Sequence, residues 1–261
     1  MTYDFSGTRV LITGGARGIG YATAEAFVCS GADVVACDRD AAELAVAVER
    51  LAEAGHGSAT GIECDLADSA SITSCVVETV RRLGGVDVLV NNAGIGSAVA
   101  LVESDDELID AILNVNLRGL ILMSREVVKV MQGQRGGGNI VNISSLAVKQ
   151  GAPNVSHYAA SKGGVLGFTI ALAAELAPAI RVNAICPGIV DTPMMKTAIE
   201  RSSQAQGISF EEAYEQRRTI VPMGRLQQPG DIAKGVLFLA SDEASEITGE
   251  ALNLTGGIAT W

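Results

Sequence analysis

Residues 9–20, RVLITGGARGIG, decide the fold of this chain. The apolar run at 9–12 is typical of a buried strand, and the glycine-rich segment after it opens a helical pattern. Gly14, Gly18 and Gly20 have the spacing GxxxGxG. Such a turn lets the backbone approach a pyrophosphate closely, and the helix N-terminus then offers its free N–H groups to the phosphates. A plain strand-to-helix connection fits the turn equally well, so the rest of the chain must decide between the two interpretations.

The alternation of strand and helix patterns continues to the end of the chain. Further strands are expected at 33–37, 58–64, 86–91, 139–143, 180–186 and 251–254, and helices at 40–54, 68–83, from 105 with Ser104 as its cap, at 117–131, 158–177 and 231–241. Strands separated by helices form parallel βαβ units with right-handed crossovers. The sequence therefore predicts an α/β fold: a doubly wound parallel sheet of about seven strands with helices on both faces. We expect a single domain over residues 1–261, with the irregular segment 189–228 inserted over one edge as a lid on the substrate.

The composition limits the functions open to this chain. Its 261 residues, 48% of them hydrophobic, can bury a large core, and the net charge of −11 argues against a nucleic-acid partner, because neutralising phosphates requires a basic surface. The five cysteines have no regular spacing, and no Cys/His cluster indicates a metal. The N-terminus is polar, and the longest apolar stretch, 163–174, is shorter than the ~20 residues that span a bilayer. We therefore expect a cytoplasmic protein with no membrane or metal partner.

Asp38 stands at the end of the second expected strand. A carboxylate there can accept hydrogen bonds from both hydroxyls of an adenosine ribose and would repel a 2′-phosphate, so it favours NAD over NADP. Arg17 and Arg39 are competing features, because either guanidinium could cover the adenine or bind a phosphate. Without this context, Asp38 would be interpreted as a solvated residue at a strand end.

Tyr158 and Lys162 lie four positions apart and so share one face of an expected helix. A free phenol is a poor base at neutral pH, and a fixed ammonium nearby should lower its pKa by on the order of one to three units. The phenol could then exchange a proton with a substrate oxygen. Ser145, or its neighbour Ser144, follows an expected strand and could donate a hydrogen bond to that oxygen. In isolation, such a pair is more often a packed tyrosine and a solvated lysine.

Further motifs are spread along nearly the whole chain. They are TGGARGIG at 13–20, Asp65-Leu66, NNAG at 91–94, NVNLRG at 114–119, IVNISS at 140–145, YAASK at 158–162, Pro187-Gly188 with Thr192, ITGE at 247–250 and Gly256-Gly257. Each motif is weak evidence by itself, but the full set in this order resembles the short-chain dehydrogenase/reductase family. The resemblance implies an NAD(P)-binding Rossmann fold and an oxidoreductase that acts on CH–OH groups.

The resemblance also implies a role for each matching residue. Tyr158 would be the general acid/base, Ser145, thirteen positions before it, would orient the substrate oxygen, and Lys162 would lower the tyrosine pKa and bind the nicotinamide ribose. Asn116 would support a water that relays protons. The cofactor would be held by Gly14, Arg17, Gly18, Ile19, Gly20, Asp38, Arg39, Asp65, Leu66, Asn92, Ala93, Gly94, Tyr158, Lys162, Pro187, Gly188, Val190 and Thr192.

Two positions need separate mention. Thr255 precedes Gly256-Gly257, where many relatives carry Asp. His157 directly precedes the expected catalytic tyrosine; it could touch the substrate, but we expect an ordinary exposed histidine.

We expect the substrate to be a small-molecule alcohol or ketone, but the sequence does not identify which one. The residues expected to surround it are Ser145, Ala147, Gln150, Asn154, Tyr158 and Met194. The leading hypothesis is hydride transfer between NAD(H) and a secondary alcohol or ketone. An NADPH-dependent 3-oxoacyl (acyl-carrier-protein) reductase is the alternative in the same class, and a catalytically inactive dinucleotide-binding sensor is the alternative in another class. The intact catalytic set argues against the sensor, which would need only the first half of the motifs.

The helix after Tyr158 carries small residues at Ala159, Gly163 and Gly167, spaced four apart. Such a face lets another backbone approach closely, and the family resemblance places this helix in a two-fold interface. We therefore expect a homotetramer built as a dimer of dimers.

Overall fold

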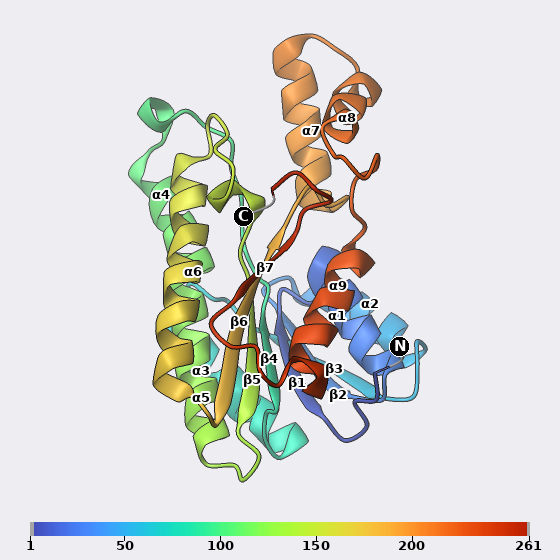
Figure 1. Cartoon of the computed structure of the whole chain (residues 1–261), viewed down its shortest axis with the longest axis vertical. Coiled ribbons are helices and arrows are strands. Elements are labelled where there is room, and N and C mark those ends of the chain that lie inside the picture. The colour runs from blue at the N-terminus through green and yellow to red at the C-terminus, as the bar shows by residue number, and fades with distance from the viewer. Residues whose placement is uncertain (1–2, 260–261) are drawn as a thin grey trace.

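The computed structural model describes residues 3–259, and its centre is one parallel sheet (Figure 1). Seven strands lie in the order β3-β2-β1-β4-β5-β6-β7. They are β1 (Arg9–Thr13), β2 (Asp33–Asp38), β3 (Ser58–Glu63), β4 (Val88–Asn91), β5 (Gly138–Ile143), β6 (Ile180–Pro187) and β7 (Ala251–Leu254). The chain runs outward from β1 to β3 and then returns to add β4 on the other side of β1, so the strand order reverses between β1 and β4. The expected doubly wound α/β fold is confirmed, and ligands bind such sheets at this reversal.

Helices cover both faces of the sheet (Figure 1). They are α1 (Gly18–Cys29), α2 (Ala41–Ala52), α3 (Ser69–Leu83), α4 (Asp106–Leu113), α5 (Leu120–Gln132), α6 (Ser156–Leu176), α7 (Pro193–Gln206), α8 (Phe210–Thr219) and α9 (Pro229–Ala240). A π-helical segment, Asn114–Gly119, joins α4 to α5, and short 3₁₀ turns lie at Leu101–Glu103, Leu146–Val148 and Asp242–Ala244. α1 and α9 pack together on one face, and α3 packs on α5 on the other.

The two hydrophobic cores follow from the alternation of side chains along each strand. On β1, Val10 and Ile12 join the core that contains Phe27 of α1, whereas Leu11 between them joins the core that contains Met123 of α5. All five side chains are fully buried. Side chains along a strand alternate between its two faces. A strand covered by helices on both faces therefore has a continuous apolar sequence, as the run at 9–12 does.

Several helix starts differ from the expected ones. The side chain of Asp105, rather than that of Ser104, caps α4 by accepting a hydrogen bond from the backbone N–H of Leu108 at 2.8 Å. α6 begins two residues before Tyr158, and α9 begins at Pro229, a residue that suits the first turn because its missing N–H is not needed there.

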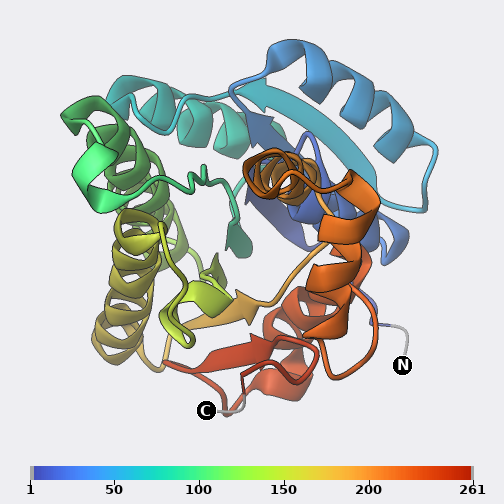
Figure 2. The same cartoon turned by 90° about the horizontal axis from the view of Figure 1, so that it is seen from above.

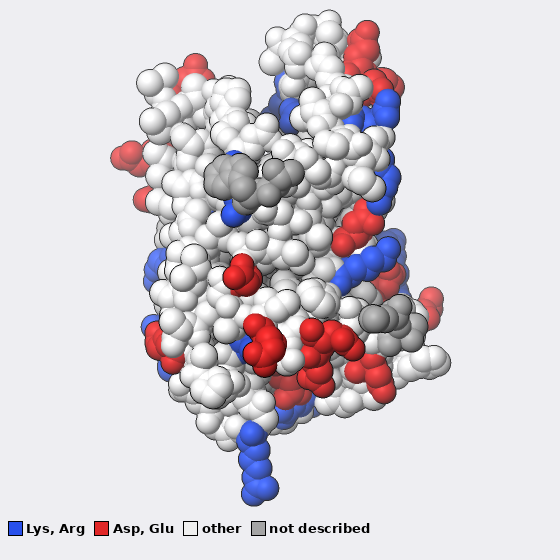
Figure 3. Space-filling view, viewed as in Figure 1, with Lys and Arg blue, Asp and Glu red and all other residues white. Residues whose placement is uncertain are grey.

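The segment 189–228 contains α7 and α8, which project beyond the end of the sheet where the strands finish (Figures 1 and 2). These helices have a small apolar core of their own, made of Ile189, Ile199, Ala213, Val221 and Leu226. The space-filling view shows a notch in the upper edge of the molecule between this projection and the rest (Figure 3). The assignment of the whole chain to one domain, with this segment as a lid, stays a prediction.

Within residues 3–259, one helix, α6, has the length and composition that a membrane span needs, with 21 residues and a mean hydropathy of 1.2 over its best window. The sequence analysis counted only the uninterrupted apolar residues 163–174 and therefore underestimated the length over which this helix is apolar. α6 packs on β6 and places the charged Lys162 in the protein interior. We interpret it as a helix of the α/β layer, because a helix that packs on a sheet satisfies the same composition test.

Candidate active site

The glycine turn after β1 is too crowded for side chains. Gly14 and Gly18 have φ values of +65° and +58°, which favour glycine. A Cβ on Gly20 would lie 2.0 Å from the carbonyl oxygen of Gly14 and 2.5 Å from Nδ2 of Asn92. α1, which starts here, has no side-chain cap and no acidic residue in its first turn, so its first N–H groups are available to an anion. This cradle fits the pyrophosphate of a dinucleotide.

Asn92 and Thr13 tie the turn to the end of β4. Thr13 Oγ1 accepts hydrogen bonds from the backbone N–H groups of Asn92 and Ala93, both at 3.0 Å. The side-chain amide of Asn92 donates to the carbonyl oxygens of Thr13 and Gly14 at 2.9 and 3.0 Å. Asn92 was expected to line the cofactor channel with its backbone; its side chain also fixes the phosphate turn at the point where the strand order reverses.

Asp38 ends β2 beside the turn. Its carboxylate accepts hydrogen bonds from the backbone N–H groups of Ala16 and Asp40, both at 3.2 Å. The carboxylate is therefore held in place next to the phosphate cradle, where an adenosine ribose would lie. Arg17 and Arg39 are both exposed, so their side chains face solvent near this carboxylate.

Asp65 and Leu66 follow β3 on the next strand outward. Leu66 is buried and Asp65 is exposed, with Oδ1 accepting a hydrogen bond from the N–H of Ala67 at 2.8 Å. β2 pairs with β3 as far as Asp38 and Glu63, so the ends of these two strands lie side by side. The residues expected at the adenine and at its ribose therefore follow neighbouring strands.

Asn116 is buried in the π-helical segment between α4 and α5. Its Oδ1 accepts from the N–H of Ile95 at 2.8 Å, and its Nδ2 donates to the carbonyl of Ile95 at 2.9 Å and to Ser161 Oγ at 3.1 Å. A Cβ on Gly94 would lie 3.2 Å from Asn116 Oδ1 and 3.3 Å from Lys162 Nζ. Asn116 and Lys162 therefore converge on Gly94, and π-helical segments of this kind often mark functional sites.

Lys162 is buried on α6, where its ammonium donates to the carbonyl oxygen of Ile143 at 2.8 Å. Burial lowers the pKa of Lys162 to about 8, because removing an ammonium from water disfavours the charged form. The side chain is therefore a cation at neutral pH, and it loses its charge as the pH rises through about 8.

Tyr158 and Ser145 are the other two residues expected to be catalytic. Burial raises the pKa of Tyr158, and a hydrogen bond with the Ser145 side chain opposes that rise. The expected lowering of this pKa by Lys162 is wrong, because burial raises the pKa and the opposing contribution comes from Ser145; the phenol is protonated at neutral pH. The neighbouring Ser144 is buried, and its hydroxyl donates to the backbone carbonyl of Lys162 at 2.9 Å. The hydroxyl proton of Ser144 is therefore engaged in a structural hydrogen bond.

The segment after β6 was expected to hold the nicotinamide through Pro187, Gly188, Val190 and Thr192. Gly188 donates its N–H to Gln227 Oε1 at 2.9 Å, and a Cβ on this glycine would lie 2.7 Å from the same oxygen. Thr192 caps α7 by accepting from the N–H of Met195 at 3.3 Å, and its methyl group would lie 3.5 Å from a Cβ on Gly18. The two ends of the expected cofactor site therefore face each other. Gln227, which the sequence analysis missed, carries no motif and is recognised only by this contact.

The expected substrate residues are only partly brought together. A Cβ on Gly96 would lie 3.3 Å from Met194 Sδ and 3.8 Å from Tyr158 Cε2, so Met194 of α7 and Tyr158 both lie next to Gly96. Ala147 donates its N–H to Ser145 Oγ at 3.1 Å. Gln150 and Asn154 are exposed on the loop before α6, and Asn154 has a left-handed φ of 65°.

The expected exposure of His157 is wrong, and Thr255 has a structural role. His157 is buried rather than exposed, with a relative exposure of 6%, and neither ring nitrogen has a hydrogen-bond partner among the described residues. Thr255 is also buried; its hydroxyl donates to the carbonyl of Ala259 at 3.0 Å and accepts from the N–H of the same residue. In this chain, Thr255 therefore closes the C-terminal turn.

Comparison with known proteins finds relatives that match this chain along nearly its whole length. Residues 14–259 match the family model described as enoyl-(acyl carrier protein) reductase. A putative ketoacyl reductase of Streptomyces coelicolor is 40% identical over 253 residues, which cover 96% of this chain and 97% of that protein. The crystal structure of a variant actinorhodin polyketide ketoreductase with NADPH superposes with a TM-score of 0.94 at 39% identity, covering 100% of both chains. That of a 3-ketoacyl-(acyl-carrier-protein) reductase from Brucella melitensis with NADH has a TM-score of 0.88 at 35% identity, covering 98% of this chain and 100% of that one.

These matches span nearly the whole chain and include the glycine turn, the strand reversal and the segment that carries Tyr158 and Lys162. The chain belongs to the short-chain dehydrogenase/reductase family and is an NAD(P)-dependent oxidoreductase of alcohols and ketones.

Proposed function

We propose that this enzyme interconverts a small secondary alcohol and its ketone, with Tyr158 as the general acid/base. The observation that carries the proposal is the hydrogen bond between Ser145 and a protonated Tyr158, close to the point where Lys162 and Asn116 converge on Gly94. When bound, the nicotinamide supplies or accepts the hydride. In the reducing direction, Ser145 orients the carbonyl oxygen and Tyr158 donates its phenolic proton to that oxygen. Lys162 stabilises the phenolate that forms, and Asn116 supports the water that returns a proton.

The pH profile of the reaction should follow Lys162. Because burial lowers the pKa of Lys162 to about 8, its charge is present below that pH and lost above it. We expect kcat/KM for ketone reduction to be level near neutral pH and to fall as the pH rises through about 8. Lys162→Arg keeps a cation at all accessible pH values, so relative to its own maximum the fall should move to higher pH, because burial raises the pKa of Tyr158, the remaining titrating group. An identical profile in the variant and the wild type would exclude Lys162 as the titrating group.

We propose NAD rather than NADP as the preferred cofactor. Support comes from Asp38, whose carboxylate is hydrogen-bonded to the backbone beside the phosphate cradle and would face a 2′-phosphate with a like charge. A panel of secondary alcohols and ketones, assayed with NAD(H) and NADP(H) side by side, tests both the reaction and the cofactor. Turnover with NADP(H) favoured would reject Asp38 as the specificity residue.

A 3-oxoacyl thioester reductase that uses NADPH is the second candidate. Two observations favour it: a relative is a putative ketoacyl reductase, and a structurally similar ketoreductase was solved with NADPH. The net charge of −11 weighs against docking an acidic carrier protein, because two acidic surfaces repel each other. Including a 3-oxoacyl thioester in the panel separates the two candidates.

We propose a homotetramer in which α6 contributes to a two-fold interface. Gly167 on α6 is exposed and a Cβ there would meet no atom within 4 Å, while the neighbouring Ile170 is 60% exposed. A small-residue face with an exposed isoleucine is suited to burial against a second copy.

Sedimentation should show a species of about 108 kDa, four times the chain mass of 26.9 kDa. Gly167→Arg places a charged side chain on the proposed interface and should shift the protein to smaller species. Gly230→Arg, at an open position on α9, is the matched control and should leave the mass unchanged. A wild-type protein that sediments only at 26.9 kDa would refute the interface.

A further inference from the structure

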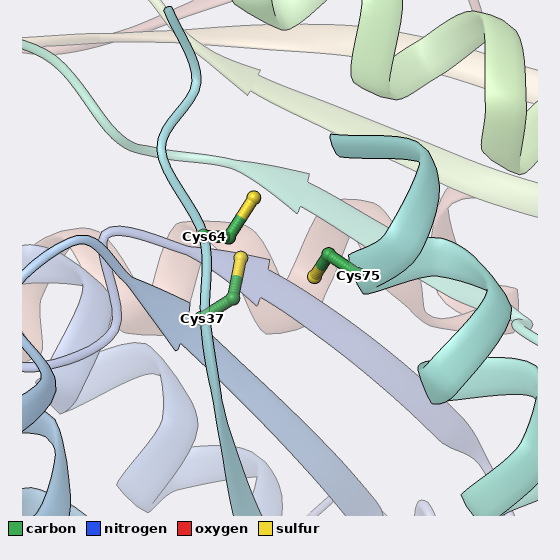
Figure 4. Close-up of side chains that lie close together, drawn as sticks. All are labelled: Cys37, Cys64 and Cys75. Atoms are coloured by element: carbon green, nitrogen blue, oxygen red, sulfur yellow. The ribbon is translucent and has the colours of Figure 1, made fainter. Parts of the chain in front are cut away.

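Three cysteines from separate parts of the sequence meet beside the sheet (Figure 4). Cys37 is the penultimate residue of β2, Cys64 directly follows β3, and Cys75 lies on α3. Their sulfur atoms all lie within 4.8 Å of one another, and all three side chains are buried. The sequence analysis found no cysteine spacing typical of a metal site, because the cluster arises from the pairing of β2 with β3 and the packing of α3 on them.

The three thiols lie close enough together to bind one ion. No sulfur atom is more than 4.8 Å from the other two, and all three side chains are buried away from solvent. One cation that replaces the thiol protons could bind all three sulfurs at once, because a metal is bound by thiolates rather than by thiols.

The geometry suits a metal ion with three sulfur ligands. With a metal–sulfur distance of about 2.3 Å, a trigonal site has sulfurs about 4.0 Å apart. Sulfurs within 4.8 Å of one another need to move inward by no more than about 0.5 Å each, which side-chain rotation can supply. Within the described chain, no fourth His, Cys, Asp or Glu ligand atom joins the group. Structural zinc is almost always four-coordinate, so a three-sulfur group favours a softer ion that accepts fewer ligands.

We propose that Cys37, Cys64 and Cys75 form a binding site for a soft monovalent cation of the Cu(I) type. The ion takes the place of the thiol protons, which leave to solvent, and no electron is transferred. The site is distinct from the catalytic group, and it lies directly beneath the adenosine end of the cofactor site, because Cys37 precedes Asp38 and Cys64 precedes Asp65. The proposal does not depend on the identity of the substrate or of the preferred cofactor.

The test uses the full-length reduced protein, without oxygen, in a Cys29→Ser background that removes the exposed thiol. Cu(I) is presented in a competing chelator, and its uptake is followed by ultraviolet thiolate-to-metal absorption and by metal analysis. We expect one Cu(I) per chain with unchanged far-ultraviolet circular dichroism. Cys37→Ala, Cys64→Ala and Cys75→Ala should each weaken binding at least ~100-fold, since even outer-shell partners of metal ligands are worth 10–100-fold.

Cys186→Ala is the matched control, because Cys186 is also buried but lies outside the cluster; it should bind Cu(I) as the parent does. If an alanine variant does not fold, the closer isostere Cys→Ser at the same position replaces it. Equal affinity in the parent and in the three cluster variants would overturn the proposal. So would Cu(I) uptake that occurs only as the protein unfolds, because the binding site would then not be the folded cluster.

Discussion

Tyr158→Phe should reduce kcat by at least ~1000-fold while the dissociation constant for NADH stays within about threefold of that of the wild type. The substitution removes the phenolic proton but leaves the ring that packs near Gly96 and Met194. Because burial raises the pKa of Tyr158, this phenol carries its proton at neutral pH and can donate it to a carbonyl oxygen. Its loss removes a proton transfer that no second described group is placed to perform, since Ser145 can orient an oxygen but is a very weak acid.

Two measurements check this prediction. Fluorescence titration gives NADH affinity, and a rate assay on the best substrate of the panel gives kcat. Ser145→Ala serves as a comparison, because it removes the orienting hydrogen bond and leaves the proton donor, so it should retain more activity than Tyr158→Phe. A Tyr158→Phe protein that keeps more than a tenth of the wild-type activity would remove Tyr158 as the acid/base.

The second large effect is expected at Asp38. If its carboxylate faces the adenosine ribose, NADP must place a phosphate against it, and like charges about 4 Å apart at an effective dielectric of about 20 repel by roughly 4 kcal/mol. Solvent at the strand end screens much of this repulsion. Loss of the ribose hydrogen bonds adds about 1.5–3 kcal/mol each, whereas Arg17 and Arg39 could pair with the phosphate and act in the opposite direction. We expect a net preference for NAD of at least ~30-fold in kcat/KM, which corresponds to about 2 kcal/mol.

Asp38→Ser should shrink this preference mainly by improving kcat/KM with NADP, because Arg39 can then bind the phosphate. Steady-state kinetics with both cofactors measures the ratio. Asp65→Ser is the control, because Asp65 lies just after the neighbouring strand β3 and is expected at the adenine rather than at the ribose. It should affect both cofactors alike. An unchanged ratio in Asp38→Ser would leave Asp38 as a strand-end residue and would favour the NADPH-dependent ketoacyl reductase.

The parts of the fold that follow from local patterns could be predicted from the sequence. The apolar run at 9–12 indicates a strand buried on both faces, and the glycines after it indicate a turn that side chains cannot enter. The cap of α4 was assigned to Ser104 instead of Asp105 because both residue types are good caps, and only the backbone geometry distinguishes them.

The chemistry of the site depended on three-dimensional surroundings that the sequence does not contain. The spacing of Tyr158 and Lys162 correctly places them on one helix, but the direction of the tyrosine pKa shift is set by burial, which the spacing does not reveal. Burial of His157 and the contact of Gln227 with Gly188 likewise depend on elements distant in sequence. The cysteine cluster is invisible for the same reason, since strand pairing brings its members together.

The most direct test of the account follows the transferred hydrogen. The wild-type enzyme is incubated with the best ketone of the panel and with NADH that carries deuterium at the reactive carbon of the nicotinamide, and the product is analysed by mass spectrometry. We predict one deuterium on the carbinol carbon of the product with the wild type, and at most about a thousandth as much labelled product in the same time with Tyr158→Phe. A wild-type protein that binds NADH but transfers no deuterium to any ketone or 3-oxoacyl thioester tested would contradict the account and indicate a dinucleotide-binding sensor.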